Sequence, residues 1–393
     1  MRISRWGGIA VAGATLAGMA VLPLSGAQAA APGVAVQVGG DSQVGGVGFE
    51  GMRFLAPRGS LTVHKGDTIT FNFKGFHTAT LLPDNTTPAD FAAQHMTGLG
   101  GPTADHSLVL QDADDTAQPS FELNKAVAFG DPTCGSSSTP CTYDGKSVVN
   151  SGISVFMPSP TWSVTVNDAP GSSFWVICLI HPDMAMHVSV VPDATATTTQ
   201  ADVDNYTTSQ LASDHEAAAA LVPKLQHPSQ HTSNGVKVWD AYAGFDGDGW
   251  GLDGMFPTNL HIKLGQTVRW HFAQLMGNIH TVTFPKATAV SLSNQFGAPI
   301  CEGANGADTP PTSQAPPFCS DPTALELGIP AAALAGVGSH SYSGSGMHSS
   351  GVEGAGAPNN APFDLKFTKR TKNGFNYACI IHGAMMHGTV YVS

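Results

Sequence analysis

Short runs of alternating apolar and polar residues recur along the chain. Clear examples are "SLTVHKGDTITFNF" from residue 60 and "NLHIKLGQTVRWHF" from residue 259, each interrupted by a glycine, Gly66 or Gly265. A period of two places successive side chains on opposite faces of a strand, so each stretch predicts two half-buried strands joined by a turn. The 45 Gly and 27 Pro residues are also typical of a turn-rich, all-β protein.

These two stretches belong to a repeat with a period of about 200 residues. "FHTATLLP" from residue 76 parallels "IHTVTFP" from 279, and "FWVICLIHPDMAMHVSVV" from 174 parallels "FNYACIIHGAMMHGTVYV" from 375. The repeat predicts two β domains, residues 33–192 and 235–393. The alignment equates four candidate residues of each half: His77 with His280, Cys178 with Cys379, His181 with His382, and Met186 with Met386.

The segments between the repeated motifs differ in composition from the strands. Residues 193–234 form a linker without β alternation, in which the stretch from Gln200 to Leu221 fits a helix ended by Pro223 or, alternatively, a disordered segment. Long segments rich in Gly, Pro, Ser and Asn, 84–148 and 286–349, interrupt the two domains. Insertions of this length are usually functional loops or loops held by a cross-link.

Residues 1–29 have the composition of a secretory signal peptide. Arg2 and Arg5 precede an apolar stretch, and Ala27-Gln28-Ala29 supplies the small residues of a cleavage site. No other stretch is apolar enough to span a bilayer. We therefore expect a secreted or periplasmic protein without stable membrane insertion after cleavage. A net charge of -12 and the lack of Lys/Arg clusters argue against a nucleic-acid partner.

The six cysteines divide into two close pairs and two single residues. Cys134 and Cys141 lie in one insertion, and Cys301 and Cys319 lie in the other, so disulfides within each pair would hold these loops. Cys178 and Cys379 remain. A bond between these two is the alternative, but each is followed by a His and then a Met, a pattern that a disulfide does not require. We therefore interpret both as metal ligands.

Each half thus offers one thiolate, two imidazoles and a thioether. Two imidazole nitrogens and a thiolate in a plane, with a weak axial Met, favour copper used for one-electron transfer. Zinc usually takes four close ligands and gains little from a thioether. Met184 and Met385 are alternative axial ligands; we favour Met186 and Met386 because each precedes the alternating final strand. The candidate copper ligands are His77, Cys178, His181, Met186, His280, Cys379, His382 and Met386.

These motifs resemble those of the cupredoxins, the type 1 blue copper proteins. "CLIHPDMAM" has the plastocyanin-like pattern Cys-x2-His-x4-Met, and "CIIHGAMMHGTVYV" is similar to the amicyanin-like loop. The spacing from His382 to Met386 lies between the two family patterns. The resemblance implies two tandem Greek-key β-sandwich domains, one copper ion at an end of each, and electron transfer with redox protein partners that the sequence does not identify.

Two other functions are compatible with a pair of such domains. Two-domain copper oxidases and nitrite reductases need a further catalytic copper, for which the family pattern places a His beside the type 1 Cys. Cys178 and Cys379 have only apolar neighbours, and the chain has no His-x-His string, so we expect an electron carrier rather than an enzyme. A copper-storage protein is the second alternative, although only "HPSQH" from 227 is typical of one. The other histidines, including His95 and His106, fit solvated positions.

Overall fold

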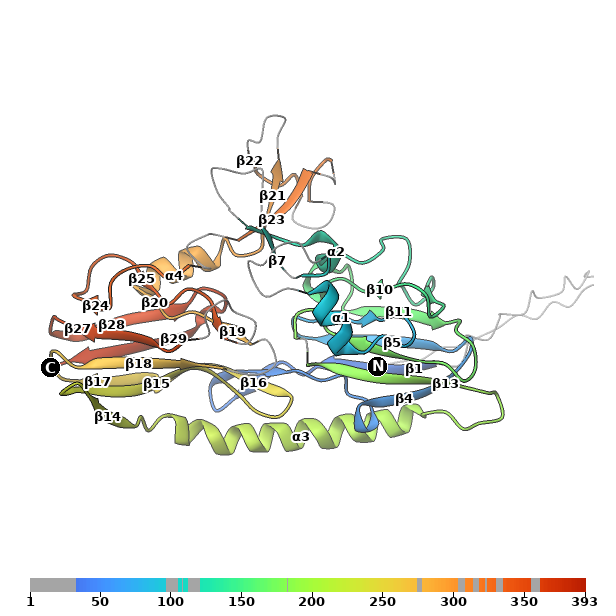
Figure 1. The fold of residues 1–393 in the computed structure, drawn as a ribbon, viewed down its shortest axis with the longest axis horizontal. Coiled ribbons are helices and arrows are strands. Elements are labelled where there is room, and N and C mark those ends of the chain that lie inside the picture. Colours follow the sequence, from blue (N-terminus) through green and yellow to red (C-terminus); the bar gives the residue numbers. More distant parts are fainter. Residues whose placement is uncertain are drawn as a thin grey trace, which may run out of the picture. The chain divides into compact units, whose positions relative to one another are not determined.

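The structure is a computed structural model that describes residues 33–96, 105–107, 109–111, 121–181, 183–273, 278–302, 308–313, 318–321, 324–329, 335–354 and 361–393. Strands dominate both halves of the chain (Figure 1). The predicted signal peptide lies outside the described residues. Within the described ranges, none of the helices has both the length and the apolar character that a bilayer crossing requires.

The first half of the chain folds as a sandwich of two sheets. Alternate residues of its strands, such as Val36, Phe71, Val176 and Val188, are buried in one shared core, as the alternation in the sequence predicts. In order, the first sheet contains β1 (Gly33–Gly39), β5 (Thr68–Lys74), β11 (Thr161–Val166) and β9 (Cys141–Tyr143). The second contains β10 (Val149–Asn150), β6 (Thr80–Leu81), β12 (Ser173–Ile177), β13 (Ala185–Val191) and β4 (Ser60–His64).

The second half repeats this sandwich. Its first sheet contains β2 (Ser42–Val44), β3 (Val47–Gly51), β16 (Trp250–Phe256), β15 (Val236–Asp246), β18 (Thr267–Phe272), β27 (Phe363–Phe367) and β24 (Ser341–Tyr342), and β14 (Gln230–Ser233) pairs with β15. Its second sheet contains β17 (Asn259–Ile262), β29 (Gly383–Val392), β28 (Thr371–Cys379), β20 (Thr283–Phe284) and β25 (His348–Ser349). β15 runs parallel to β18 as β1 runs parallel to β5. The predicted fold class, two tandem Greek-key β-sandwiches, is confirmed.

A hairpin from the first half completes a sheet of the second half. β2 and β3 precede β4 in the chain, yet β3 pairs antiparallel with β16, and Phe49 lies opposite Leu252. The predicted domain limits, 33–192 and 235–393, follow the sequence repeat, whereas this sheet takes strands from both ranges. The described residues all belong to one compact unit.

The linker contains a long helix, α3 (Gln200–Leu225), which begins at a capping box made by Thr199 and Asp202. The prediction that Pro223 ends this helix is wrong, because the helix continues to Leu225. Pro223 lies in the last turn, where its missing N–H removes only one bond of the helix. Val222 and Leu225 on either side of it are buried against β3 and β16 residues, and this packing stabilises the turn.

The two long insertions meet in a small sheet. Its strands, in order, are β22 (Asp308–Thr309), β21 (Ala298–Glu302), β23 (Leu325–Ile329), β8 (Phe121–Leu123) and β7 (Val109–Gln111), and β23 pairs with β8 across the two insertions. Short helices complete these segments: α1 (Pro88–His95), α2 (Lys125–Ala128) and α4 (Lys286–Ser293). The remaining elements are the 3-10 helices η1 (Pro57–Gly59) and η2 (Ser154–Phe156) and the ribbon of β19 (Ile279–His280) with β26 (Glu353–Gly354).

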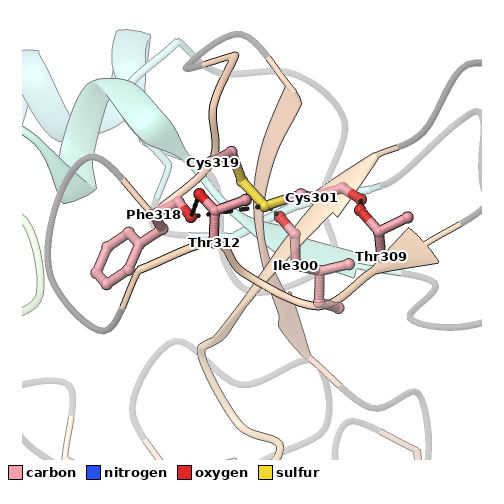
Figure 2. Close-up of a disulfide and its surroundings, with 6 residues drawn as sticks. All are labelled: Ile300, Cys301, Thr309, Thr312, Phe318 and Cys319. Carbon is pink, nitrogen blue, oxygen red and sulfur yellow. Dashed lines mark hydrogen bonds between the residues drawn. A yellow bond between two sulfur atoms is a disulfide. The ribbon is translucent and has the colours of Figure 1, made fainter.

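Both predicted disulfides are present, Cys134–Cys141 and Cys301–Cys319. Figure 2 shows the second, which joins β21 to the segment around Phe318. Thr312 Oγ1 donates a hydrogen bond to the carbonyl of Phe318 at 2.8 Å, and Thr309 Oγ1 donates one to the carbonyl of Cys301 at 2.7 Å. Each disulfide lies within one insertion, as the sequence indicates, and Cys141, Cys301 and Cys319 are buried with apolar residues of the two cores.

Candidate metal centres

The first candidate centre lies at one end of the first sandwich. His77 precedes β6, Cys178 directly follows β12, and His181 lies in the loop between β12 and β13. The Nδ1 atoms of the two histidines are 3.2 Å apart, and Cys178 Sγ is 3.7 Å from His181 Nδ1. All three side chains are buried, and their ligand atoms lie within 4.8 Å of one another. Three donors from two separate parts of the chain therefore converge on one point.

Local hydrogen bonds hold this arrangement. The amide of Thr78 points at Cys178 Sγ at 3.4 Å, and the hydroxyl of Thr78 accepts a hydrogen bond from the amide of Leu179 at 2.8 Å. Within the loop, the amide of Cys178 donates to the carbonyl of Met184, and the amide of Met184 donates to the carbonyl of His181. Thr78, which follows His77, therefore links the segment before β6 to the loop that begins at Cys178.

The second half builds the same centre from the equivalent residues. His280 Nδ1 is 3.2 Å from His382 Nδ1, and Cys379 Sγ is 3.5 Å from His382 Nδ1. Thr281 takes the place of Thr78, because its amide lies 3.3 Å from Cys379 Sγ. The structure thus brings together the predicted His and Cys residues of both halves.

The two cysteines are predisposed to the thiolate form. Burial by itself would raise the pKa of Cys178, but hydrogen bonds and charge from His181 and His77 outweigh it and hold the pKa well below its usual value. The same competition, with the charge of His382 as the largest lowering effect, lowers the pKa of Cys379. A thiolate is the form in which Cys binds a metal.

A glycine lies directly against the outer edge of the first histidine in each half. A Cβ atom added to Gly39 would overlap Nε2 of His77, and one added to Gly244 would overlap Nε2 of His280. Both glycines have positive φ, 77° and 74°. In the described part of the chain, neither Nε2 atom has a hydrogen-bond partner, although both are buried. The histidines are therefore held by close packing, with Nδ1 facing the centre.

The strand register corrects our alignment of the methionines. Val176 pairs with Met186, whereas the equivalent Tyr377 pairs with Gly388. Met184 and not Met186 is therefore the structural counterpart of Met386. The error arose because the second loop contains one additional residue, taken up by a register shift between Ala378 and Cys379.

Burial separates the methionine candidates in the second half. Met386 is buried and belongs to the core that contains Cys379, whereas Met385 is 80% exposed. In the first half both Met184 and Met186 are buried, so the register and not burial distinguishes them.

Carboxylates lie beside the outer nitrogens of the second histidines. Glu50 Oε1 is 3.2 Å from His181 Nε2, and Asp253 Oδ1 is 3.8 Å from His382 Nε2. Burial would raise the pKa of Glu50, but the charge and hydrogen bond of His181 lower it to about 2. Neither acid was predicted from the sequence. A signal was available, since "GFEGM" from 48 and "GLDGM" from 251 repeat an acid at one position.

A further acid and a surface cluster were also not predicted. Partial burial, with 39% of the side chain exposed, and the nearby charge of Glu50 raise the pKa of Asp41 to about 7; its Oδ1 lies 3.9 Å from His77 Nε2. Elsewhere, His95 Nδ1 and His106 Nδ1 lie 2.8 and 3.2 Å from the same oxygen of Asp105. The sequence analysis placed His95 and His106 at separate solvated positions. In the structure they share one carboxylate oxygen instead.

The donor set fits copper better than other common metals. One thiolate, two imidazole nitrogens and nearby buried thioethers form the ligand type that selects copper in trigonal sites. In each half the donors converge on one point and are oriented by neighbouring groups, as metal ligands usually are, and all of them except the partly exposed His382 are buried. Both centres accordingly resemble type 1 copper sites.

Comparisons with known proteins give only remote similarity. No protein-family model and no curated protein matches the sequence. Among solved structures, the multicopper oxidase mgLAC is 10% identical, with 93% of this chain and 87% of that chain covered and a TM-score of 0.18. The copper nitrite reductase of Thermus scotoductus SA-01 is 12% identical, with 93% and 99% covered and a TM-score of 0.23. That of Nitrosomonas europaea is 11% identical, with 92% and 93% covered and a TM-score of 0.16.

Proposed function

We propose that this protein is a secreted electron-transfer protein that holds one type 1 copper ion in each half. The observation that carries the proposal is the duplication of one buried centre: in both halves two Nδ1 atoms lie 3.2 Å apart beside a cysteine sulfur. A duplicate kept only for structural reasons would not need a second complete set of donors. Copper, when bound, supplies a one-electron couple between Cu(II) and Cu(I).

The ligands that we assign differ from our first alignment at one position. In the second half, His280, Cys379, His382 and Met386 would hold the copper ion. In the first half we assign His77, Cys178 and His181 together with Met184, because the register makes Met184 the counterpart of Met386.

The surrounding residues suit repeated electron transfer. The strands and the hydrogen-bonded loop hold the donors in place, so little rearrangement accompanies a change of charge. The amides of Thr78 and Thr281 point at the two cysteine sulfurs, and such hydrogen bonding around the sulfur tunes the potential of these sites. Burial of all three donors in the first half, and of His280 and Cys379 in the second, also limits the access of water.

The surroundings of the cysteines support a carrier over an oxidase or reductase. Leu179 and Ile380, which directly follow the cysteines, are buried in a common apolar cluster. No imidazole therefore follows either sulfur to reach a neighbouring catalytic metal. The partners that we propose are redox proteins of the same extracytoplasmic compartment, which the two disulfides also fit.

The test is a measurement of copper per chain, with the visible and paramagnetic resonance spectra of the oxidised mature protein. We expect two copper ions per chain and only thiolate-to-copper signals. Cys178→Ala and Cys379→Ala should each remove one copper ion and its share of the blue absorption, and Met385→Leu should change neither. A further, non-blue copper signal would favour an enzyme, and colourless or zinc-filled protein would contradict the proposal.

A further inference from the structure

The two halves are joined by one motif that pairs with its own repeat. Residues 48–50 are Gly-Phe-Glu and residues 251–253 are Gly-Leu-Asp. In the ladder between β3 and β16, Gly48 lies opposite Asp253, Phe49 opposite Leu252, and Glu50 opposite Gly251. Because the ladder is antiparallel, the motif and its repeat are related by a local two-fold axis, as in a self-complementary interface.

The two faces of this ladder have different roles. Phe49 and Leu252 share one face, where they are buried with Ala218 and Val222 of α3. Glu50 and Asp253 lie on the opposite face, since side chains alternate along a strand. They are diagonal neighbours, whose Cβ atoms in such ladders are about 7 Å apart. The glycine opposite each acid leaves space, and a Cβ atom on Gly48 would press on the side chain of Asp253.

Each acid extends to the candidate centre of its own half. Glu50 reaches His181 Nε2 at 3.2 Å, and Asp253 lies 3.8 Å from His382 Nε2. The opposite edges of these imidazoles carry the Nδ1 atoms that face the cysteines. A continuous series of side chains and one strand pair therefore connects the two centres.

The electrostatics agree with this proximity. The charge of Glu50 interacts with His181 and also with His382 of the other centre. Glu50 and Asp253, neighbours on one face of the ladder, therefore lie close to both candidate centres.

We infer that the β3–β16 ladder joins the two centres into one redox unit, in which an electron passes between the two copper sites of the same molecule. The exchange is balanced without other reactants: one site is oxidised from Cu(I) to Cu(II), the other is reduced from Cu(II) to Cu(I), and no proton or bond is transferred. Glu50 and Asp253 are positioning residues: Glu50 contacts His181 Nε2 directly, and Asp253 faces His382 Nε2 across 3.8 Å, beyond hydrogen-bond length. The inference rests on the proposed function.

The first test is the proximity of the sites. Paramagnetic resonance of the fully oxidised wild-type protein should show spin coupling that is absent from Cys178→Ala and Cys379→Ala, each of which retains one site. A wild-type spectrum equal to the sum of the two single-site spectra would overturn the inference. Loss of copper or of blue colour from the wild type would instead contradict the proposed function.

The second test follows the electron. Met386→Gln should give the second site its own spectrum and a lower potential, because the axial ligand sets the potential. After a flash that reduces a small fraction of the sites, we expect electrons to move to the first site at a rate independent of protein concentration. A rate proportional to concentration, or no transfer, would overturn the inference. An unchanged spectrum in Met386→Gln would count against the ligands assigned in the proposed function.

Variants of the two acids test the role of the ladder. In the Met386→Gln background, Glu50→Ala and Asp253→Ala should slow the electron transfer to the first site that follows the flash. Glu50→Gln should keep most of the rate, because its amide oxygen still accepts a hydrogen bond from His181. Asp364→Ala serves as the control, since Asp364 pairs with Arg269 on a neighbouring strand pair. Equal rates in all four variants, with both copper ions retained, would contradict the positioning role.

Discussion

Gly39 packs directly against the imidazole of His77, so that a Cβ atom at position 39 would overlap Nε2 of the ring. We therefore expect Gly39→Ala to displace His77 and to abolish copper binding in the first half. Half of the blue absorption should be lost, as measured by copper content and visible spectroscopy. The backbone strain of a residue at positive φ adds about 1–2 kcal/mol of destabilisation.

Gly66→Ala is the matched control for this prediction. Gly66 also has a positive φ, 94°, but apart from its own chain neighbours nothing lies within 4 Å of the position that a Cβ atom would take there. This variant should show the loss of stability without the loss of copper. Equal copper binding in Gly39→Ala and Gly66→Ala would show that the close contact does not position His77.

Met184 and Met186 can be distinguished by conservative substitution. Met184→Leu should shift the absorption and raise the reduction potential of the first site, because a weak donor to the metal is removed. Met186→Leu should leave both unchanged. Since leucine nearly conserves the volume, each change should cost less than about 1.5 kcal/mol of stability. If a spectroscopic redox titration showed these changes in Met186→Leu and not in Met184→Leu, Met186 would be the ligand, as the sequence analysis favoured.

Glu50 should lower the reduction potential of the first site. Its carboxylate is buried 3.2 Å from His181 Nε2, and a negative charge there stabilises the more positive, oxidised state. Glu50→Gln keeps an acceptor but removes the charge, so the potential of the first site should rise in a redox titration. Asp364→Asn is the control, and an unchanged or lower potential in Glu50→Gln would contradict the prediction.

Asp41 should make the stability of the metal-free protein depend on pH. Partial burial, followed by the charge of Glu50, raises its pKa from 3.8 to about 7. A carboxyl with a raised pKa binds its proton more tightly in the folded state than in the unfolded state, and this difference adds to the free energy of unfolding. The added stability is complete below pH 3.8 and is lost as the pH rises through 7. Asp41→Asn should therefore become progressively more stable than wild type between these pH values.

Thermal unfolding of the metal-free protein at several pH values measures this difference. Asp193→Asn, which changes an exposed carboxyl after β13, should show no such trend. A constant difference between Asp41→Asn and wild type from pH 3.8 to 7 would contradict the assignment to Asp41.

The sequence by itself was sufficient wherever the signal is local or repeated. Apolar and polar residues alternate along the strands because successive side chains point to opposite faces of the sheet. The duplication identified both sets of His and Cys. The spacing of Cys134 and Cys141, and of Cys301 and Cys319, predicted the disulfides because short loops bring such pairs together. These features depend on neighbouring residues and need no knowledge of the partner strand.

Tertiary structure alone decided how distant segments meet. The pairing of β3 with β16 places Glu50 and Asp253 beside the two centres, and one additional residue in a loop moves the counterpart of Met386 from Met186 to Met184. Packing against β3 and β16 likewise lets α3 continue beyond Pro223. Strand pairing and register are set by the sum of many long-range contacts, and a local pattern is the same whichever strand it finally meets.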